Sequence, residues 1–205
     1  MLNLEVDNLC KSFGRRKIFE NINFSIVKGD SIAIIGPNGS GKTTMLSLLL
    51  GLSYPTKGKV IYSENNKPLN FEAFRRKLSL VAPYYSLYDS LSGSENLSFF
   101  AKIDGIRLSN DKIKTLLTKV GLSGRGDDFV SAYSTGMKQR LKYAVSLIRE
   151  PEIMILDEPT ANLDSDGKKI VSHVIEEYRS RAIIIIATNE KEEYSLAGQV
   201  CQLVS

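Results

Sequence analysis

The 205-residue sequence has no tryptophan, a single histidine and only two cysteines. Cys10 and Cys201 lie near opposite ends of the chain, which argues against a disulfide framework or a cysteine metal site and favours a reducing compartment. No apolar run approaches the ~20 residues needed to cross a bilayer. Residues 1–7 also lack the basic and apolar segments of a signal peptide. These absences predict a soluble protein.

The formal net charge of +4 is small. It is compatible with a membrane surface or nucleic acid as a partner, but a solvated surface of mixed charge is the simpler interpretation. With 42% hydrophobic and 24% charged residues, the composition is that of an ordinary globular protein. A chain of this length can bury an ample core as one large domain.

Hydrophobic periodicity predicts strands that alternate with helices. Residues 2–9 and 22–26 alternate apolar and polar side chains, as half-buried strands do. Short apolar runs predict further strands at residues 31–35, 59–62, 78–81, 153–156 and 183–187. The last run is rich in β-branched residues and predicts a central parallel strand that is buried on both faces. Strands in alternation with helices indicate the α/β class.

Residues 94–148 have a mostly helical pattern. One helix is expected after a Ser109 cap, with Ile113, Leu116, Leu117 and Val120 on its apolar face. Because this block separates two halves of the α/β pattern, we predict a single domain over residues 1–205. Its core covers about 1–84 and 149–205, and an inserted helical subdomain covers about 85–148. The last core strand comes close to Ser205, so no appended regulatory domain is expected.

A glycine-rich stretch between a strand and a helix fits the phosphate-binding pattern G-x-x-x-x-G-K-[ST]. Backbone N–H groups of such a P-loop, and of the helix that follows, bind phosphate oxygens. Lys42 is expected to reach the β- and γ-phosphates of a nucleotide, and Thr43 to offer its hydroxyl to Mg²⁺. The predicted phosphate-binding residues are Gly36, Pro37, Asn38, Gly39, Ser40, Gly41, Lys42, Thr43 and Thr44.

Two acids follow the apolar run at residues 153–156. P-loop proteins place a carboxylate beside Mg²⁺ at the end of such a strand, so Asp157 is predicted to be a metal ligand together with Thr43. Glu158 points elsewhere and fits a general base that orients the attacking water. The pair is weak evidence alone and strong evidence after a P-loop in the same domain.

Residues 133–141 lie between these two motifs. Ser134 suits an N-cap, and the segment on its own is a capped amphipathic helix. Its expected buried stripe consists of Met137, Leu141, Ala144, Val145 and Ile148.

In this position the segment resembles the signature motif of ATP-binding cassette (ABC) proteins. The P-loop, the Asp157-Glu158 pair and the turn at residues 162–164 resemble the family's other motifs, in order and spacing, along essentially the whole chain. The chain is therefore similar to the nucleotide-binding subunit of an ABC transporter. In its compactness and in the sequence of residues 133–140, the chain resembles the export-type subunits, including the haem-exporter group.

The resemblance implies a P-loop NTPase (RecA-like) core with an N-terminal antiparallel β subdomain and an inserted α-helical subdomain. It also implies that two copies pack head to tail, with each ATP and its Mg²⁺ between the P-loop of one copy and the signature helix of the other. The turn at Asp164 then faces the partner copy. The signature residues expected to contact the partner's ATP are Ser134, Thr135, Gly136 and Met137.

Three further residues have two interpretations each. Phe13 stands where the family stacks an aromatic ring on adenine, and a core position is its alternative. Lys138 and Arg140 either add positive charge near the partner's γ-phosphate or are solvated surface residues.

The sequence departs from the family at two positions. Pro83 stands where the family has a glutamine that contacts Mg²⁺ and the attacking water, so water or a neighbour such as Tyr84 has to substitute. Asn189 stands where the family has a histidine that touches the γ-phosphate, and its amide donates a hydrogen bond but carries no charge. The one histidine, His173, is expected on the surface. With Lys42 and Glu158 present, we expect hydrolysis to continue at a reduced rate.

The resemblance favours an ATP-hydrolysing subunit that energises a separate membrane-spanning permease from the cytoplasmic face of the cell membrane. A second copy of the chain, or a related ATPase subunit, is the other expected partner, and nucleic acid is not expected. The alternatives are an ATP-gated dimerisation switch with weak hydrolysis and a non-transport ABC protein. The family docks the permease on the helical subdomain and on the loop at residues 83–89. The expected apolar docking residues are Tyr84, Tyr85, Leu87, Tyr88 and Leu91, and packing of the subdomain is the alternative role for them.

Overall fold

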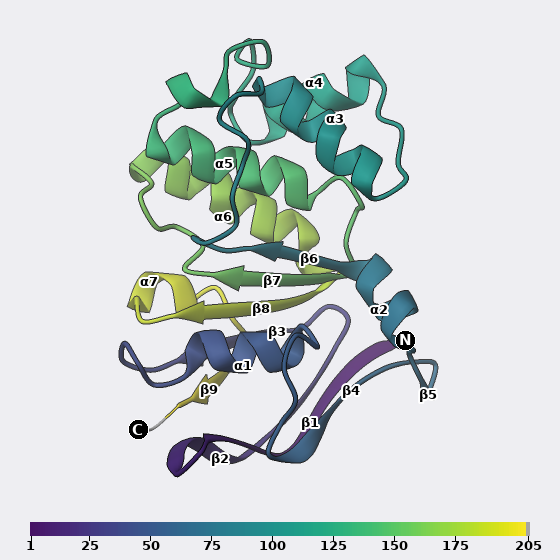
Figure 1. Ribbon diagram of the computed structural model, residues 1–205, viewed down its shortest axis with the longest axis vertical. Helices are drawn as coiled ribbons and strands as arrows, with labels where there is room; N and C mark the ends of the chain where they lie inside the picture. Colours follow the sequence, from purple (N-terminus) through teal and green to yellow (C-terminus); the bar gives the residue numbers. More distant parts are fainter. Residues whose placement is uncertain (204–205) are drawn as a thin grey trace.

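The computed structural model describes residues 1–203 as two β-sheets and a set of helices (Figure 1). None of the helices within that range is both long and apolar enough to cross a membrane. The strands are β1 (Leu2–Phe13), β2 (Arg16–Val27), β3 (Ser31–Ile35), β4 (Lys57–Glu64), β5 (Lys67–Pro68), β6 (Leu78–Val81), β7 (Ile153–Asp157), β8 (Ile183–Thr188) and β9 (Gln199–Gln202). The helices are α1 (Lys42–Leu49), α2 (Phe71–Lys77), α3 (Gly93–Ile103), α4 (Asn110–Lys119), the 3₁₀ turn η1 (Val130–Ala132), α5 (Thr135–Ser146), α6 (Ser165–Arg179) and α7 (Lys191–Tyr194).

The N-terminal sheet is antiparallel, with strand order β2-β1-β4-β5. The alternation that predicts β1 is confirmed, because Leu2, Leu4 and Val6 are buried. The strand is longer than predicted and continues to Phe13, where it turns into β2. This hairpin places Phe13 opposite Arg16. The predicted antiparallel β subdomain is confirmed.

The second sheet is parallel, with strand order β6-β7-β8-β3-β9. The predicted central strand is confirmed, because all of β8 is buried between β7 and β3. Alternate residues of β7 face two different cores. Ile153 and Ile155 pack with α1 and the antiparallel sheet, whereas Met154 and Leu156 pack with α5 and α6. The α/β fold class is therefore confirmed.

Helices α3, α4 and α5 lie in the region with the helical pattern (Figure 1). The predicted caps are confirmed, since Ser109 accepts a hydrogen bond from the N–H of Lys112 and Ser134 accepts one from the N–H of Met137. The predicted stripe of α5 is only partly buried. Leu141 and Ala144 are buried inside the helix and Ile148 is buried beyond its end, but Met137 and Val145 keep part of their surface exposed.

Helices α2 and α7 have no counterpart in the sequence-based prediction. They contain seven and four residues, which is too short for a helical period to stand out. Their local signals are weak as well. Asn70 caps α2 by accepting a hydrogen bond from the N–H of Ala73, whereas α7 has no side-chain cap.

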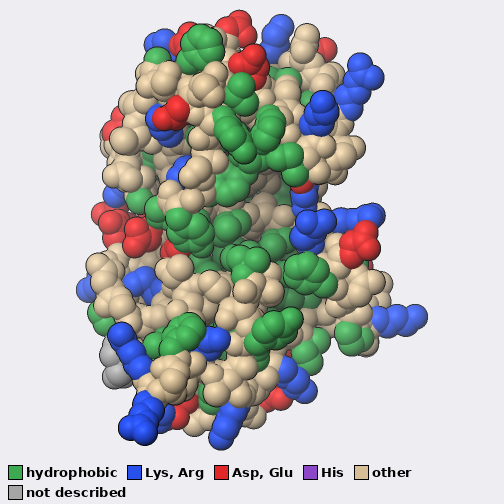
Figure 2. Space-filling view, viewed as in Figure 1, with side chains coloured by type: hydrophobic (Ala, Val, Ile, Leu, Met, Phe, Trp, Pro, Cys, Tyr) green, Lys and Arg blue, Asp and Glu red, His purple; other side chains and the backbone are tan. Residues whose placement is uncertain are grey.

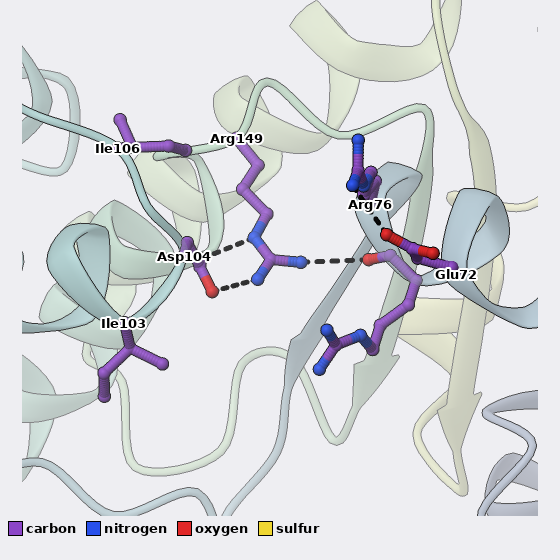
Figure 3. Close-up of a pocket in the computed structure, with 7 residues that line it drawn as sticks. Glu72, Arg76, Ile103, Asp104, Ile106 and Arg149 are labelled. Carbon is purple, nitrogen blue, oxygen red and sulfur yellow. Dashed lines mark hydrogen bonds and ion pairs between the residues drawn. The ribbon is translucent and has the colours of Figure 1, made fainter.

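An ion pair joins the helices to the core where α5 leads into β7. Arg149 pairs with Asp104 at the end of α3, and its guanidinium also donates to the carbonyl of Arg75 in α2 (Figure 3). Both partners are mostly buried, with side chains 23% and 20% exposed. A second ion pair on the same surface, Arg76 with Glu72, is far more open, at 76% and 70%.

These two ion pairs supply a matched comparison. Asp104→Ala leaves the partly buried Arg149 without its carboxylate, so we expect a loss of about 1–3 kcal/mol in the free energy of unfolding. Glu72→Ala removes an exposed pair, and we expect a loss below about 1 kcal/mol. Urea denaturation of both variants measures the difference. Equal losses would contradict the assigned role of Arg149 at this junction.

Candidate functional site

The carboxyl ends of the parallel strands meet at one edge of the sheet, where α/β proteins bind ligands. A cavity of about 530 Å³ lies there, between the P-loop, the end of β7 and the β1–β2 hairpin. Nine of the residues singled out in the sequence line it: Phe13, Asn38, Gly39, Gly41, Lys42, Thr43, Thr44, Asp157 and Glu158. Pro83 and Tyr84 line it too, together with two residues that the sequence analysis missed, Arg16 and Ile18.

The P-loop turns sharply and encloses the ammonium of Lys42. Gly41 has a φ of 100° and stands at the N-cap of α1, and a Cβ atom on it would lie 2.4 Å from Cγ2 of Ile18. Only glycine fits there. Lys42 is buried, and its Nζ donates to the carbonyls of Gly36 at 2.7 Å and Pro37 at 3.3 Å. Gly36, Pro37 and Ser40 do not line the cavity themselves.

Asp157 is buried at the end of β7. Burial raises the pKa of this carboxyl to about 6, and the charges of Glu158 and Glu193 act in the same direction. The charge of Lys42 and a hydrogen bond with Thr43 oppose the shift. The two predicted metal ligands, Thr43 and Asp157, are thus in contact with each other.

Glu158 turns away from the strand that precedes it. Its φ is 48°, a left-handed conformation that is unfavourable for a residue with a side chain. Its N–H donates to the carbonyl of Ala187 in β8 at 2.9 Å. The change in backbone direction separates the two acids, so that Asp157 lies against Thr43 while Glu158 lines the cavity as a separate carboxylate.

The two departures from the family pattern lie beside this cavity. Nδ2 of Asn189 is 3.5 Å from Oδ1 of Asn38 in the P-loop, although Asn189 does not line the cavity itself. The pKa of the Tyr84 phenol is raised, first by its own burial and second by the charge of the nearby Asp157 carboxylate. Pro83 accepts a hydrogen bond through its carbonyl from Lys142 of α5.

The signature residues do not line the cavity of their own chain. They form the first turn of α5, where Ser134 and Thr135 are exposed. A Cβ atom on Gly136 would lie 3.3 Å from the carbonyl oxygen of Asn162, so this turn packs against the turn that precedes Asp164. The carboxylate of Asp164 caps α6 through the N–H of Gly167.

The alternatives left open for single residues can now be compared with their positions. Phe13 is 57% exposed at the cavity, so the interpretation as a core residue is wrong. Lys138 pairs with Asp89 at 2.8 Å, and Arg140 donates to the carbonyls at residues 120 and 121, so both cations have partners in their own chain. His173 is exposed, as predicted.

The donor set fits a nucleoside triphosphate with Mg²⁺. The loop supplies a buried ammonium, and Ser40 Oγ is buried without a hydrogen-bond partner among residues 1–203. The hydroxyl of Thr43 and the carboxylate of Asp157 are the hard oxygen ligands that Mg²⁺ prefers. The exposed ring of Phe13 suits an adenine base.

Comparison with known proteins agrees with this geometry. A family model described as ABC transporter matches residues 19–161. The chain is 38% identical over 186 residues to the lantibiotic transport ATP-binding protein SrtF of Streptococcus pyogenes. The aligned region covers 91% of this chain and 79% of that protein. It is 37% identical over 164 residues to the bacitracin transport ATP-binding protein BcrA of Enterococcus faecalis, covering 80% of this chain and only 53% of that protein.

A solved structure is similar over nearly the whole chain. The putative ABC transporter (ATP-binding protein) from Pyrococcus furiosus superposes with a TM-score of 0.84 at 25% identity. The match covers 98% of this chain and 97% of that one.

The raised pKa of Asp157 predicts a pH-dependent effect on stability. The pKa is about 6 in the folded chain and about 3.9 in an unfolded one. The folded state thus favours the neutral carboxyl, and the stability that this preference contributes is lost as the pH rises through 6. Asp157→Asn stays neutral, so we expect it to be about 1–2 kcal/mol more stable than the wild type at pH 7.5 and equal to it at pH 4.

Urea denaturation at the two pH values, with EDTA and without nucleotide, measures this effect. Asp127→Asn changes an exposed carboxylate and is the control. A gain for Asp157→Asn that is the same at both pH values would contradict the assigned cause.

Proposed function

The chain belongs to the ATP-binding subunits of the ABC transporter family, and from this premise we propose that it hydrolyses ATP to drive transport through a separate membrane-spanning permease. The observation that carries the proposal is that Asp157 and Glu158 line the same cavity as the P-loop. This arrangement brings hydrogen-bond donors for phosphate, a carboxylate for Mg²⁺ and a carboxylate for the attacking water into one site. The permease, and a position on the cytoplasmic face of the membrane, are part of the proposal.

In this mechanism the P-loop N–H groups and Lys42 bind the β- and γ-phosphates. Thr43 and Asp157 hold Mg²⁺, and the chemistry that Mg²⁺ supplies when bound is neutralisation of phosphate charge. The carboxylate of Glu158 orients a water and accepts its proton. Phe13 stacks on the adenine without reading a specific base edge.

The other half of the site comes from a second ATPase subunit. Ser134, Thr135, Gly136 and Met137 are exposed or partly exposed at the first turn of α5, outside their own cavity. A helix N-terminus binds anions, so this turn suits the γ-phosphate held by the P-loop of a partner copy. Because Gly136 packs against the turn at residue 162, Asp164 reaches the same interface.

Export is the direction that the resemblance to export-type subunits suggests. The named relatives are transport ATP-binding proteins for a lantibiotic and for bacitracin, so a peptide antibiotic is one cargo consistent with the proposal. The finer resemblance to the haem-exporter group stays a prediction.

The permease is proposed to dock in a groove between the parallel sheet and the helices. Figure 2 shows hydrophobic side chains along this junction, with lysine and arginine side chains at its right-hand end. Two adjoining cavities, of about 290 and 470 Å³, share Ile103, Asp104 and Arg149 there. The first contains Tyr85, which belongs to the docking surface predicted from the sequence.

Charge defines the proposed occupant of this groove. Arg149 and Arg76 each have a carboxylate partner (Figure 3). Arg75 lines the same cavity and has no carboxylate partner among residues 1–203. A cytoplasmic segment of the permease with apolar side chains and one carboxylate complements this arrangement. The neighbouring loop adds Tyr84 and Tyr88, which are exposed, and Leu87 and Leu91, which are partly buried.

Glu158→Gln tests the sandwich mechanism. The amide still lies against the site but accepts no proton, so we expect ATP to bind and hydrolysis to fall at least about 100-fold. The ATP that is not hydrolysed then stabilises a dimer. Size-exclusion chromatography is expected to detect this dimer with ATP and not with ADP. Lys42→Ala in the same background is the control and is expected to stay monomeric. A monomeric Glu158→Gln with saturating ATP would sink the mechanism.

Asn189→His tests whether position 189 affects the rate. A histidine there adds a group that is able to carry charge close to the P-loop. We expect kcat to rise severalfold while the Kd for ATP changes less than about twofold. The measurement is steady-state phosphate release beside equilibrium ATP binding. An unchanged kcat removes position 189 from the catalytic set.

A further inference from the structure

The loop that follows Glu158 is held from two sides by buried polar side chains. From α5, Gln139 and the hydroxyl of Tyr143 both donate to the carbonyl of Pro159, at 3.4 and 3.0 Å. From α7, the carboxylate of Glu193 accepts hydrogen bonds from both the N–H and the hydroxyl of Thr160, the first at 2.8 Å. All of these donors and acceptors are buried.

We call these hydrogen bonds from Gln139, Tyr143 and Glu193 the frame of the loop. The frame is needed because the backbone of Glu158 is strained. A residue with a side chain at φ 48° is disfavoured by roughly 1–2 kcal/mol, and such conformations persist only where surrounding contacts determine them. Within the turn, the N–H of Ala161 donates to the carbonyl of Glu158. The N–H of Glu158 ties the start of the turn to Ala187 in β8, and the bonds at Pro159 and Thr160 fix the two residues that follow.

Glu193 is the most costly member of this frame. It is 3% exposed, and among residues 1–203 it has no lysine or arginine within ion-pair distance and no hydrogen-bond partner for its Oε2. An apolar side chain would fill the same space without the desolvation of a carboxylate. Its two hydrogen bonds to one threonine are therefore the feature that explains its presence.

We propose that Glu193 is a positioning residue for hydrolysis, one that holds Thr160 and thereby keeps Glu158 in its left-handed conformation at the site. This inference rests on the proposed function. Glu193 also lies on the segment that carries Asn189, whose amide reaches Asn38 in the P-loop. A displacement of residues 189–193 is thus transmitted to the loop of the general base through one carboxylate.

The first test needs no catalysis. In Glu193→Ala the N–H of Thr160 loses its acceptor, so we expect its hydrogen exchange in the nucleotide-free full chain to accelerate at least tenfold. Glu192→Ala removes an exposed carboxylate from the same short helix and is the matched control, with unchanged exchange at Thr160. Unchanged exchange in Glu193→Ala would overturn the proposal.

The second test separates positioning from binding. For Glu193→Ala and Thr160→Val we expect kcat to fall at least tenfold, with the Kd for ATP within twofold of wild type. Thr160→Ser keeps the hydroxyl and Glu193→Gln keeps an acceptor oxygen, so both are expected to retain most of the activity. The double variant Glu193→Ala/Thr160→Val is expected to be no slower than the slower single variant, because both changes remove one interaction.

Each contrary outcome has its own meaning. A normal kcat in Glu193→Ala, or a loss of ATP affinity as large as the loss of kcat, overturns the positioning role. So does a Thr160→Ser variant that is as slow as Thr160→Val. A wild-type chain that hydrolyses no faster than Glu158→Gln contradicts the proposed function instead, and hydrogen exchange then decides alone whether Glu193 holds the loop.

Discussion

Opposite charges are buried together at the carboxyl edge of the parallel sheet, and the rest of the structure makes this possible. The ammonium of Lys42 lies inside the P-loop on loop carbonyls, and the carboxylate of Asp157 lies against Thr43. Parallel strands bring both segments to one edge although they are more than a hundred residues apart. The two apolar cores on the faces of the sheet exclude water from beneath this edge. Burial raises the pKa of Asp157, and a cation bound there offsets that cost.

The same edge explains why Glu158 differs from the acid beside it. Continued extended backbone would carry the chain on along β7, whereas the left-handed turn changes its direction immediately after Asp157. The two residues that follow are held by hydrogen bonds. Side chains of α5 donate to the carbonyl of Pro159, and the N–H of Thr160 donates to Glu193 of α7. The signature helix and the segment beyond β8 therefore both contact the loop that carries the proposed base. Movement of either one has a short path to the site.

Much of the fold was predictable, because its signals are local. The central strand follows from a run of β-branched residues, and the caps at Ser109 and Ser134 follow from residue type and position. The short helices α2 and α7 were missed because a single turn or two has no readable period. In the site, the P-loop and Asp157 were predicted from contiguous motifs, and both line the cavity. Arg16 and Ile18 were missed, because they reach the cavity only through the pairing of β1 with β2.

The sequence by itself indicated the family and the order of most of the strands and longer helices, and it predicted the phosphate loop. Each of these depends on neighbours in the chain, where backbone preference and side-chain spacing act directly. Only the tertiary structure decided which distant residues meet. It showed that Phe13 is exposed at the cavity and not in the core, and that Lys138 pairs with Asp89. It also placed the carboxylate of Glu193 on Thr160. No local pattern encodes such a contact, because it arises from the packing of α7 beside the sheet.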